Sequence, residues 1–312
     1  MRHLTFIVGT GRSGSTLLSR ILNLHPGILS LNELFASLQE PDRALPAEPV
    51  TGDAFWRILS DVNPVFDALI RAGVPLPEFL RPRPAAPALC LMALPHLTNE
   101  PDSVLDDLAR EITRWPRRPA PAHYRAFFDL LSARFGRGDA VVERSGYSLH
   151  WIPRLRAAFP TARFVHLYRN GPDCALSMSR HVGYRVISLL RDPPADLTVP
   201  FDPAAAVARD LPVTRFGALW SELITEGVAH LDAVPPGLRT TMAYEDLLAA
   251  PDRELSRLAA FAGATSHASW LTAAGSLLDP TRQGASRHLA PDALAHLRAS
   301  CAPGTRALAR AR

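Results

Sequence analysis

The sequence predicts an α/β fold, a three-layer domain with a central parallel sheet of about five strands and helical insertions. Three observations predict this fold. Short apolar runs typical of buried strands recur along the 312 residues. Helical patterns lie between these runs, and the first run leads through a glycine-rich turn directly into a helix. The candidate strands are residues 4–8, 28–31, 140–142, 163–167 and 238–242.

The first element is the segment LTFIVGTGRSGSTLLSRIL, residues 4–22. A strand, a glycine-rich loop and a helix in this order point loop amides and a helix N-terminus at one anion. The spacing from Gly9 to Gly14 matches the phosphate-loop template, with Thr16 at its hydroxyl position, so the domain is predicted to be P-loop-like. The predicted phosphate contacts are Gly11, Arg12, Ser13, Gly14, Ser15 and Thr16. The alternative is that these glycines only form a tight turn.

The loop lacks the lysine that the template requires. Ser15 stands at that position, and no lysine occurs anywhere in the chain, whereas Arg12 lies inside the turn. Phosphoryl transfer depends on a loop lysine and a metal ion to manage the charge of the β- and γ-phosphates. An arginine beside hydroxyl groups instead fits a donor that transfers a less charged group, such as a sulfuryl group, and leaves a nucleotide phosphate behind.

The segment GTGRSGSTLL resembles the 5′-phosphosulfate loop of the sulfotransferases that use 3′-phosphoadenosine-5′-phosphosulfate (PAPS). The arginine-containing version is typical of the protein-tyrosine, carbohydrate and bacterial small-molecule members. Residues 162–179 resemble the 3′-phosphate segment of the same family, in which an arginine ends a strand and a serine follows eight positions later. The resemblance implies that Arg169 and Ser177 bind the 3′-phosphate, and a guanidinium is suited to such a contact. By itself, a strand-end arginine is more often a salt-bridge partner.

Two weaker resemblances lie nearer the C-terminus. Residues 242–264 resemble the Tyr-Glu-Asp-Leu segment of the family, which implies that Tyr244 contacts the adenine. The alternative is a tyrosine that packs under a helix. In the segment TRQGASRHL, Arg282, Ser286 and Arg287 stand where relatives often have a basic phosphate-contacting loop, and we favour Ser286 and Arg287 as the contacts.

The acceptor hydroxyl needs a base. Glu33 follows the candidate strand 28–31, at the strand end where ligands bind in open parallel sheets. The resemblance to protein-tyrosine sulfotransferases implies that a glutamate at this place is the base, although Glu33 could instead cap the next helix. The rival bases are His3, His25, His166 and His181.

Arg144 is a second catalytic candidate, because relatives commonly have a lysine and a small hydroxyl residue near the transferred group where this chain has Arg144-Ser145. Arginine does not donate its proton, so the expected role of Arg144, like that of Arg12, is to stabilise developing charge. The alternative is a surface ion pair between Glu143 and Arg144.

Composition limits the other possibilities. The formal net charge of +4 is too small to indicate a nucleic-acid surface, and no stretch has the length of a membrane span. The three cysteines are far apart, which argues against a disulfide framework or a zinc site. Since the N-terminus shows no signal-peptide pattern, a cytoplasmic location is expected.

The prediction for residues 1–312 is therefore a single sulfotransferase domain. Residues 41–136 are rich in proline but retain aromatic and leucine residues, which favours a folded insertion on the substrate side. Residues 182–213 form a second excursion and a possible lid. The expected activity is sulfuryl transfer from PAPS, without a metal, to a hydroxyl of a small-molecule, sugar, lipid or peptide acceptor, with PAP as product. The alternative is a kinase-like nucleotide-binding protein with a degenerate phosphate loop.

Overall fold

The computed structural model describes residues 2–38, 40–138, 140–191, 202–279 and 281–310. Five strands are present in these residues: β1 (His3–Val8), β2 (Ile28–Asn32), β3 (Ala140–Arg144), β4 (Arg163–Tyr168) and β5 (Arg239–Ala243). Each lies within two residues of its predicted bounds. The part 192–201 of the possible lid lies outside the described residues.

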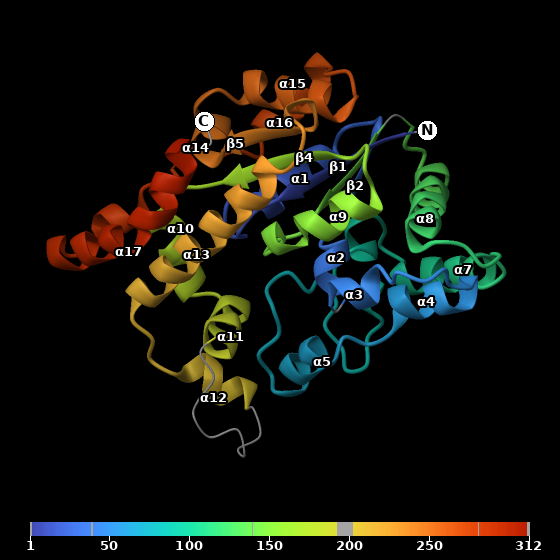
Figure 1. Cartoon of the computed structure of the whole chain (residues 1–312), viewed down its shortest axis with the longest axis horizontal. Helices are drawn as coiled ribbons and strands as arrows, with labels where there is room; N and C mark the ends of the chain where they lie inside the picture. The colour runs from blue at the N-terminus through green and yellow to red at the C-terminus, as the bar shows by residue number, and fades with distance from the viewer. Residues whose placement is uncertain (1, 39, 139, 192–201, 280, 311–312) are drawn as a thin grey trace.

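Helices connect and surround these strands (Figure 1). They are α1 (Ser15–Asn23), α2 (Leu34–Ser37), α3 (Pro41–Ala44), α4 (Gly52–Ser60), α5 (Pro64–Arg71), α6 (Ala88–Leu91), α7 (Pro101–Ile112), α8 (Ala120–Arg134), α9 (Ile152–Ala158), α10 (Gly171–Ser179), α11 (Val182–Leu190), α12 (Pro203–Ala208), α13 (Val213–Asp232), α14 (Tyr244–Ala249), α15 (Pro251–Ala262), α16 (Ala268–Gly275) and α17 (Pro291–Arg310). Within the described residues, no helix combines the length and the apolar content needed to cross a lipid bilayer.

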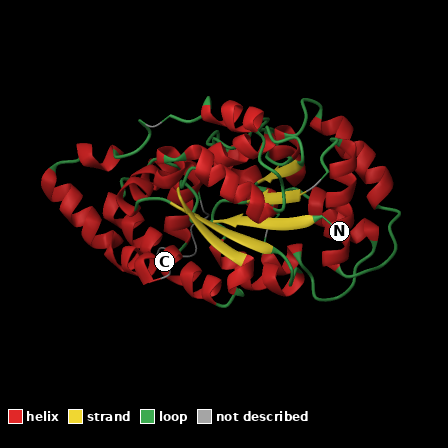
Figure 2. Ribbon diagram, turned by 90° about the horizontal axis from the view of Figure 1, so that it is seen from above, coloured by secondary structure: helices red, strands yellow, loops and turns green. Residues whose placement is uncertain are grey.

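The sheet has the order β2-β3-β1-β4-β5, and every neighbouring pair is parallel. The predicted three-layer α/β fold with a central parallel sheet is therefore confirmed, and Figure 2 shows helices on both faces of the strands. Parallel pairing brings the carboxyl ends of all five strands to one edge. β1 is the middle strand of the sheet, with β3 and β2 on one side of it and β4 and β5 on the other. The loop after β1 thus leaves the sheet at a switch point, where ligands bind in open α/β sheets.

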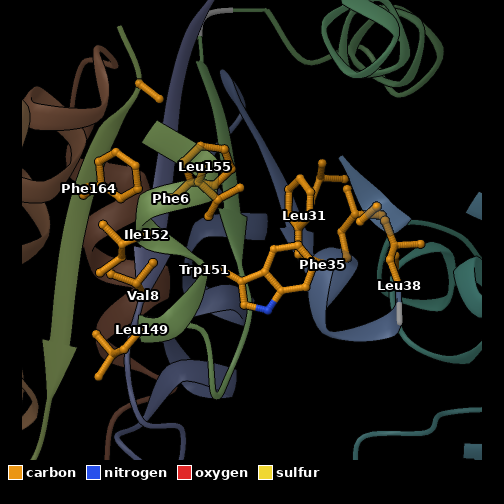
Figure 3. Close-up of a cluster of buried hydrophobic side chains, with 14 of the residues drawn as sticks. Phe6, Val8, Leu31, Phe35, Leu38, Leu149, Trp151, Ile152, Leu155 and Phe164 are labelled. Atoms are coloured by element: carbon orange, nitrogen blue, oxygen red, sulfur yellow. The ribbon is translucent and has the colours of Figure 1, made fainter. Parts of the chain in front are cut away.

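Alternating side chains of the strands build two apolar layers. Phe6 and Val8 of β1 pack on one face against α9 and α2, as Figure 3 shows with Trp151, Ile152 and Phe35. Ile7 faces the other layer, formed with α1, α15 and α16. The ring centroid of Phe6 lies 5.5 to 5.9 Å from three other phenylalanine rings. Full burial of one such side chain stabilises the fold by roughly 1.5–3 kcal/mol, so β1 is a rigid base for the loop that follows it.

The segment 41–136 forms the six helices α3 to α8. In Figure 1 it lies beside the β2 edge of the sheet and below it, and α5 approaches α11 and α12. The residues after β1, β2, β3, β4 and β5 meet at the edge that α5 and α11 approach. This arrangement positions the candidate site.

Candidate functional site

A cavity of about 220 Å³ lies at the carboxyl ends of the strands. It is lined by Gly11, Arg12, Gly14, Ser15, Thr16, Leu17, Glu33, Glu78, Gly146, Arg169, Ser177, Tyr184, Tyr244 and Arg282. These residues come from the loop after β1 and the start of α1, from the ends of four other strands, from the helices α10 and α11, and from two loops that contain Glu78 and Arg282. Residues more than 200 positions apart in the sequence therefore line one small space.

The loop after β1 has the backbone of an anion cradle. Gly11, Arg12 and Gly14 have φ angles of 72°, 55° and 86°, which turns successive amides toward the same side. Within the described part of the chain, no amide from Gly11 to Leu17 donates a hydrogen bond to another residue, and the buried Ser13 hydroxyl has no partner. Buried donors without partners are rare in folded proteins. The loop thus offers a set of free donors to an anion.

Two glycines of the loop are required by close approaches. A Cβ atom on Gly11 would overlap the hydroxyl of Tyr184, and one on Gly14 would overlap the ring of Tyr244. Tyr184 donates a hydrogen bond from this hydroxyl to the carbonyl of Thr10. Two tyrosines from distant segments therefore form the walls on either side of the loop.

Arg12 is held by contacts on two sides. Its Nε donates to the Ser177 hydroxyl at 3.1 Å, and its NH1 lies 3.2 Å from Oε1 of Glu78. Both carboxylate oxygens of Glu78 lie 3.0 Å from Nε2 of His181, and Nδ1 of His181 accepts from the Gly183 amide. Because Nδ1 accepts a hydrogen bond, Nε2 is the nitrogen of His181 that donates a hydrogen bond to Glu78. The hydrogen bond to His181, together with Arg12, lowers the pKa of Glu78 although burial opposes the shift.

A second basic group lies at the end of β4. Arg169 lies over the ring of Tyr244, 5.0 Å from the centroid, and donates to the Arg282 carbonyl at 3.0 Å. Its carboxylate neighbour Asp173 is 3.8 Å away. The buried Nε of Arg169 has no partner among the described residues. One guanidinium donor thus remains available beside the aromatic wall.

Glu33 lies between the cavity and a buried arginine. Its Oε1 pairs with NH1 of Arg144, and its Oε2 accepts from the Gly146 amide at 2.8 Å. Arg144 also contacts Asn32 and Ser15, and its Nε has no partner among the described residues. Burial raises the pKa of Glu33, while Arg144 and Gly146 oppose that rise. A carboxylate with a raised pKa is better matched to proton transfer near neutral pH.

The alternatives for Glu33 and Arg144 do not describe this structure. Glu33 stands at the N-cap position of α2 with a φ of 56°, but its side chain makes no capping hydrogen bond. Arg144 is only 1% exposed and Glu143 2%, so they form no surface pair. Arg144 is absent from the cavity lining and contacts Glu33 and Asn32 from behind. Arg144 thus contacts the cavity through Glu33, and its expected charge-stabilising role stays a prediction.

Ser286 and Arg287 do not join the other candidates. Both line a neighbouring cavity, and the amide and hydroxyl of Ser286 donate to Asp173. From the same segment, Arg282 is the residue that lines the main cavity. Ser13 belongs to the loop but is fully buried and does not line the cavity.

Of the four rival histidines, His181 alone is close to the cavity. His3 and His25 lie at the amino ends of β1 and β2, at the opposite edge of the sheet. His166 is buried within β4, and burial lowers its pKa to about 4.

Four lining residues, Leu17, Glu78, Gly146 and Tyr184, are not among the predicted site residues. Glu78 lies in the proline-rich insertion, where neither periodicity nor a motif distinguishes it from other surface glutamates. Leu17 belongs to the loop motif and Gly146 directly follows the Arg144-Ser145 pair, so a motif could have indicated these two.

The fold and site define an α/β protein whose loop between a strand and a helix presents unpartnered hydrogen-bond donors to a cavity. The profile of the sulfotransferase family matches residues 5–268, so the chain belongs to this family and is an enzyme of sulfuryl transfer. No curated protein matches the chain closely enough to count as a relative.

Solved structures share the fold at low identity. The sulfotransferase domain of the Synechococcus PCC 7002 olefin synthase is 19% identical with a TM-score of 0.51, and the match covers 96% of this chain and 95% of that one. The sulfotransferase domain of the curacin biosynthetic pathway is 18% identical with a TM-score of 0.50, covering 94% and 82%. STF9 from Mycobacterium avium is 16% identical with a TM-score of 0.51, covering 96% and 75%.

Proposed function

We propose that the protein transfers the sulfuryl group of PAPS to a hydroxyl of an acceptor and releases PAP. The observation that carries this proposal is the convergence of Arg12, Ser177, Arg169 and Tyr244 on one cavity next to a loop with free amides. Two separate basic groups are what a ligand with phosphates at both the 5′ and the 3′ position requires.

The unpartnered donors suggest how the residues fit this donor substrate. The amides from Gly11 to Thr16, with the hydroxyls of Ser15 and Thr16, would hold the 5′-phosphate. Arg12 would neutralise the oxygen that bridges phosphorus and sulfur. Arg169, with its free Nε, and Ser177 would bind the 3′-phosphate, and the Tyr244 ring would lie against the adenine.

Glu33 is the proposed general base. The acceptor oxygen attacks sulfur in line with the leaving phosphate, and its proton passes to the Glu33 carboxylate. The bond between sulfur and the bridging oxygen breaks, and its electron pair leaves with PAP. Arg144 acts as a positioning residue, because it is fully buried and holds one carboxylate oxygen while Gly146 holds the other. The base is thus fixed in orientation before the acceptor arrives.

The proposal is tested by thermal shift with PAP, AMP and ATP–magnesium. We expect PAP to stabilise the protein most, because only PAP has a 3′-phosphate for Arg169. At about 100 times its Kd a ligand adds about 2.7 kcal/mol of stability, which corresponds to several degrees in Tm. Stabilisation by ATP–magnesium without stabilisation by PAP would overturn the proposal and favour the kinase-like alternative.

The Arg169→Ala variant localises the 3′-phosphate. It should weaken PAP binding at least tenfold and bring PAP close to AMP in affinity. Arg287→Ala is the matched control, since Arg287 lies in the neighbouring cavity. Should Arg287→Ala weaken PAP as much and Arg169→Ala not at all, the assignment of the 3′-phosphate would move to the segment around Ser286.

A further inference from the structure

A second cavity of about 260 Å³ adjoins the one described above. The two cavities share Glu33, Glu78, Gly146 and Tyr184. The proposed base thus stands at the junction between the anion cradle and this second space. A group bound in the second cavity has a direct path to the proposed sulfuryl position.

The lining of the second cavity is mainly apolar, and two helical segments contribute most of its aliphatic side chains. One side is formed by Val65, Phe66, Leu69 and Leu76, on and after α5. The other side is formed by Val186, Ile187 and Leu190 of α11, which lies near α5 in Figure 1. Segments that are more than 100 residues apart therefore enclose one apolar space.

Exposed apolar side chains mark the opening of this cavity. Among the described residues, four large hydrophobic side chains are exposed: Leu24, Val65, Leu80 and Leu190. Two of them, Val65 at 48% and Leu190 at 55%, line the second cavity. Exposed apolar groups at the opening of a concave site favour an apolar ligand.

The charged residues around the cavity limit the net charge that a ligand can carry. Among the described residues that line it there is no arginine, although the chain contains 34 basic residues, all of them arginine. Three carboxylates, Glu33, Glu40 and Glu78, do line it. Glu33 and Glu78 are paired with Arg144 and Arg12, whereas Glu40 is exposed to solvent. Two histidines, His150 and His181, also line the cavity, and a bound anion would lie close to the three carboxylates.

We propose that the second cavity is the acceptor site and that the acceptor is an uncharged alcohol or phenol with an apolar body. This inference rests on the proposed sulfotransferase function. The hydroxyl lies at the junction beside Glu33, and the apolar body extends along α5 and α11 toward Val65 and Leu190. An anionic acceptor, such as a charged polysaccharide or a carboxylate, is rejected because no arginine among the described lining residues balances its charge.

Two matched probes test the acceptor class. They are 4-pentylphenol and the same phenol with a carboxylate at the end of its alkyl chain. Binding to the PAP-saturated protein is measured by calorimetry, and sulfation is measured with PAPS. We expect 4-pentylphenol to bind and to react with a kcat/KM at least tenfold higher than that of the carboxylate. Its binding should show a negative heat-capacity change, as apolar burial requires.

Two matched variants test whether the acceptor binds in the second cavity. Leu190→Asp should raise the KM for 4-pentylphenol at least fivefold and leave kcat and PAP binding nearly unchanged. Leu80→Asp is the control, because Leu80 is 51% exposed and lines neither cavity. Both sites are on the surface, so neither variant should prevent folding.

The outcomes test the acceptor assignment separately from the proposed PAPS-dependent function. If PAP binds but the carboxylate reacts as well as 4-pentylphenol, or Leu190→Asp behaves like Leu80→Asp, the acceptor inference is overturned and the donor assignment stands. If PAP binds to none of these proteins, the proposed function is wrong and the inference falls with it.

Discussion

Glu33 and Glu78 both line the two cavities, yet their contacts assign them different roles. Glu33 is paired from behind with the buried Arg144, and burial raises its pKa. Glu78 is paired with Arg12, a group that belongs to the anion cradle, and its pKa is lowered. The phosphosulfate of a bound donor substrate must therefore compete with Glu78 for Arg12. Glu33 does not take part in this competition, because it is paired with Arg144.

Different effects on PAP affinity are predicted for the two glutamine variants. Glu33→Gln should leave the Kd of PAP within about threefold of the wild-type value and reduce kcat by about 10²–10⁴, the usual contribution of a general base. Glu78→Gln should strengthen PAP binding by about three- to tenfold, because it removes a carboxylate that competes for Arg12. Calorimetric titration and steady-state kinetics measure both.

Glu40→Gln is the matched control for this pair, since Glu40 lines only the second cavity and is exposed. Its PAP affinity should not change. Replacing Glu33 leaves Arg144 without a charged partner, so a lower Tm is also expected for Glu33→Gln. Retained PAP binding in this variant would show that the PAP site is still folded. Unchanged turnover in Glu33→Gln would show that the base lies elsewhere.

At the scale of elements, the loop between β1 and α1 depends on its contact with the start of α14. Gly14 has a φ of 86°, and a Cβ at this position would overlap the ring of Tyr244, the first residue of α14. The sheet brings the two together because β1 and β5 end at the same edge on either side of β4.

Gly14→Ala should therefore abolish measurable PAP binding and lower the Tm. Gly73→Ala isolates the cause, because Gly73 has a φ of 73° but no neighbouring group lies within 4 Å of the place that an added methyl would occupy. The backbone strain alone, about 1 kcal/mol, should appear in both variants, and the loss of PAP binding only in Gly14→Ala. Thermal unfolding with and without PAP makes the comparison, and equal behaviour of the two variants would exclude the contact with Tyr244 as the reason.

At the scale of the whole molecule, a buried carboxyl group links stability to pH. Glu143 lies inside the sheet on β3, where its Oε1 accepts from the Ser145 hydroxyl and the Phe35 amide. Burial raises the pKa of Glu143 to about 7 from an ordinary value of 4.5. Between these two values the folded chain holds a proton that the unfolded chain has lost, so the free energy of unfolding falls as pH rises.

Glu143→Gln should remove this contribution. Its amide oxygen can accept the same two hydrogen bonds without carrying a charge. Relative to the variant, the wild-type protein should lose on the order of 3 kcal/mol between about pH 4.5 and about pH 8, since one pKa unit corresponds to about 1.4 kcal/mol. Urea unfolding of both proteins at several pH values tests this. A constant difference across the range would show that Glu143 titrates normally.

The strands and the loop could be predicted because their causes are local. Short apolar runs predict β1 and β4, and the glycines of the loop require backbone conformations that few other residues adopt. Arg12 lies inside this loop, while Arg169 and Tyr244 are implied by the family resemblance of the segments that contain them; all three line the cavity. Ser286 and Arg287 are favoured by the resemblance to a basic loop of relatives, whereas the path of the backbone places Arg282 of the same segment in the cavity.

The order of residues along the chain thus determined the parallel sheet, the glycine-rich loop after β1 and the family to which the protein belongs, because these depend on spacing within short segments. Tertiary structure alone decided that Glu78 of the insertion pairs with Arg12, that Arg144 lies behind Glu33, and that α5 and α11 enclose an apolar cavity. Such contacts join segments that are far apart in the sequence. They arise when burial of the core brings those segments together, and no local pattern encodes which side chains then meet.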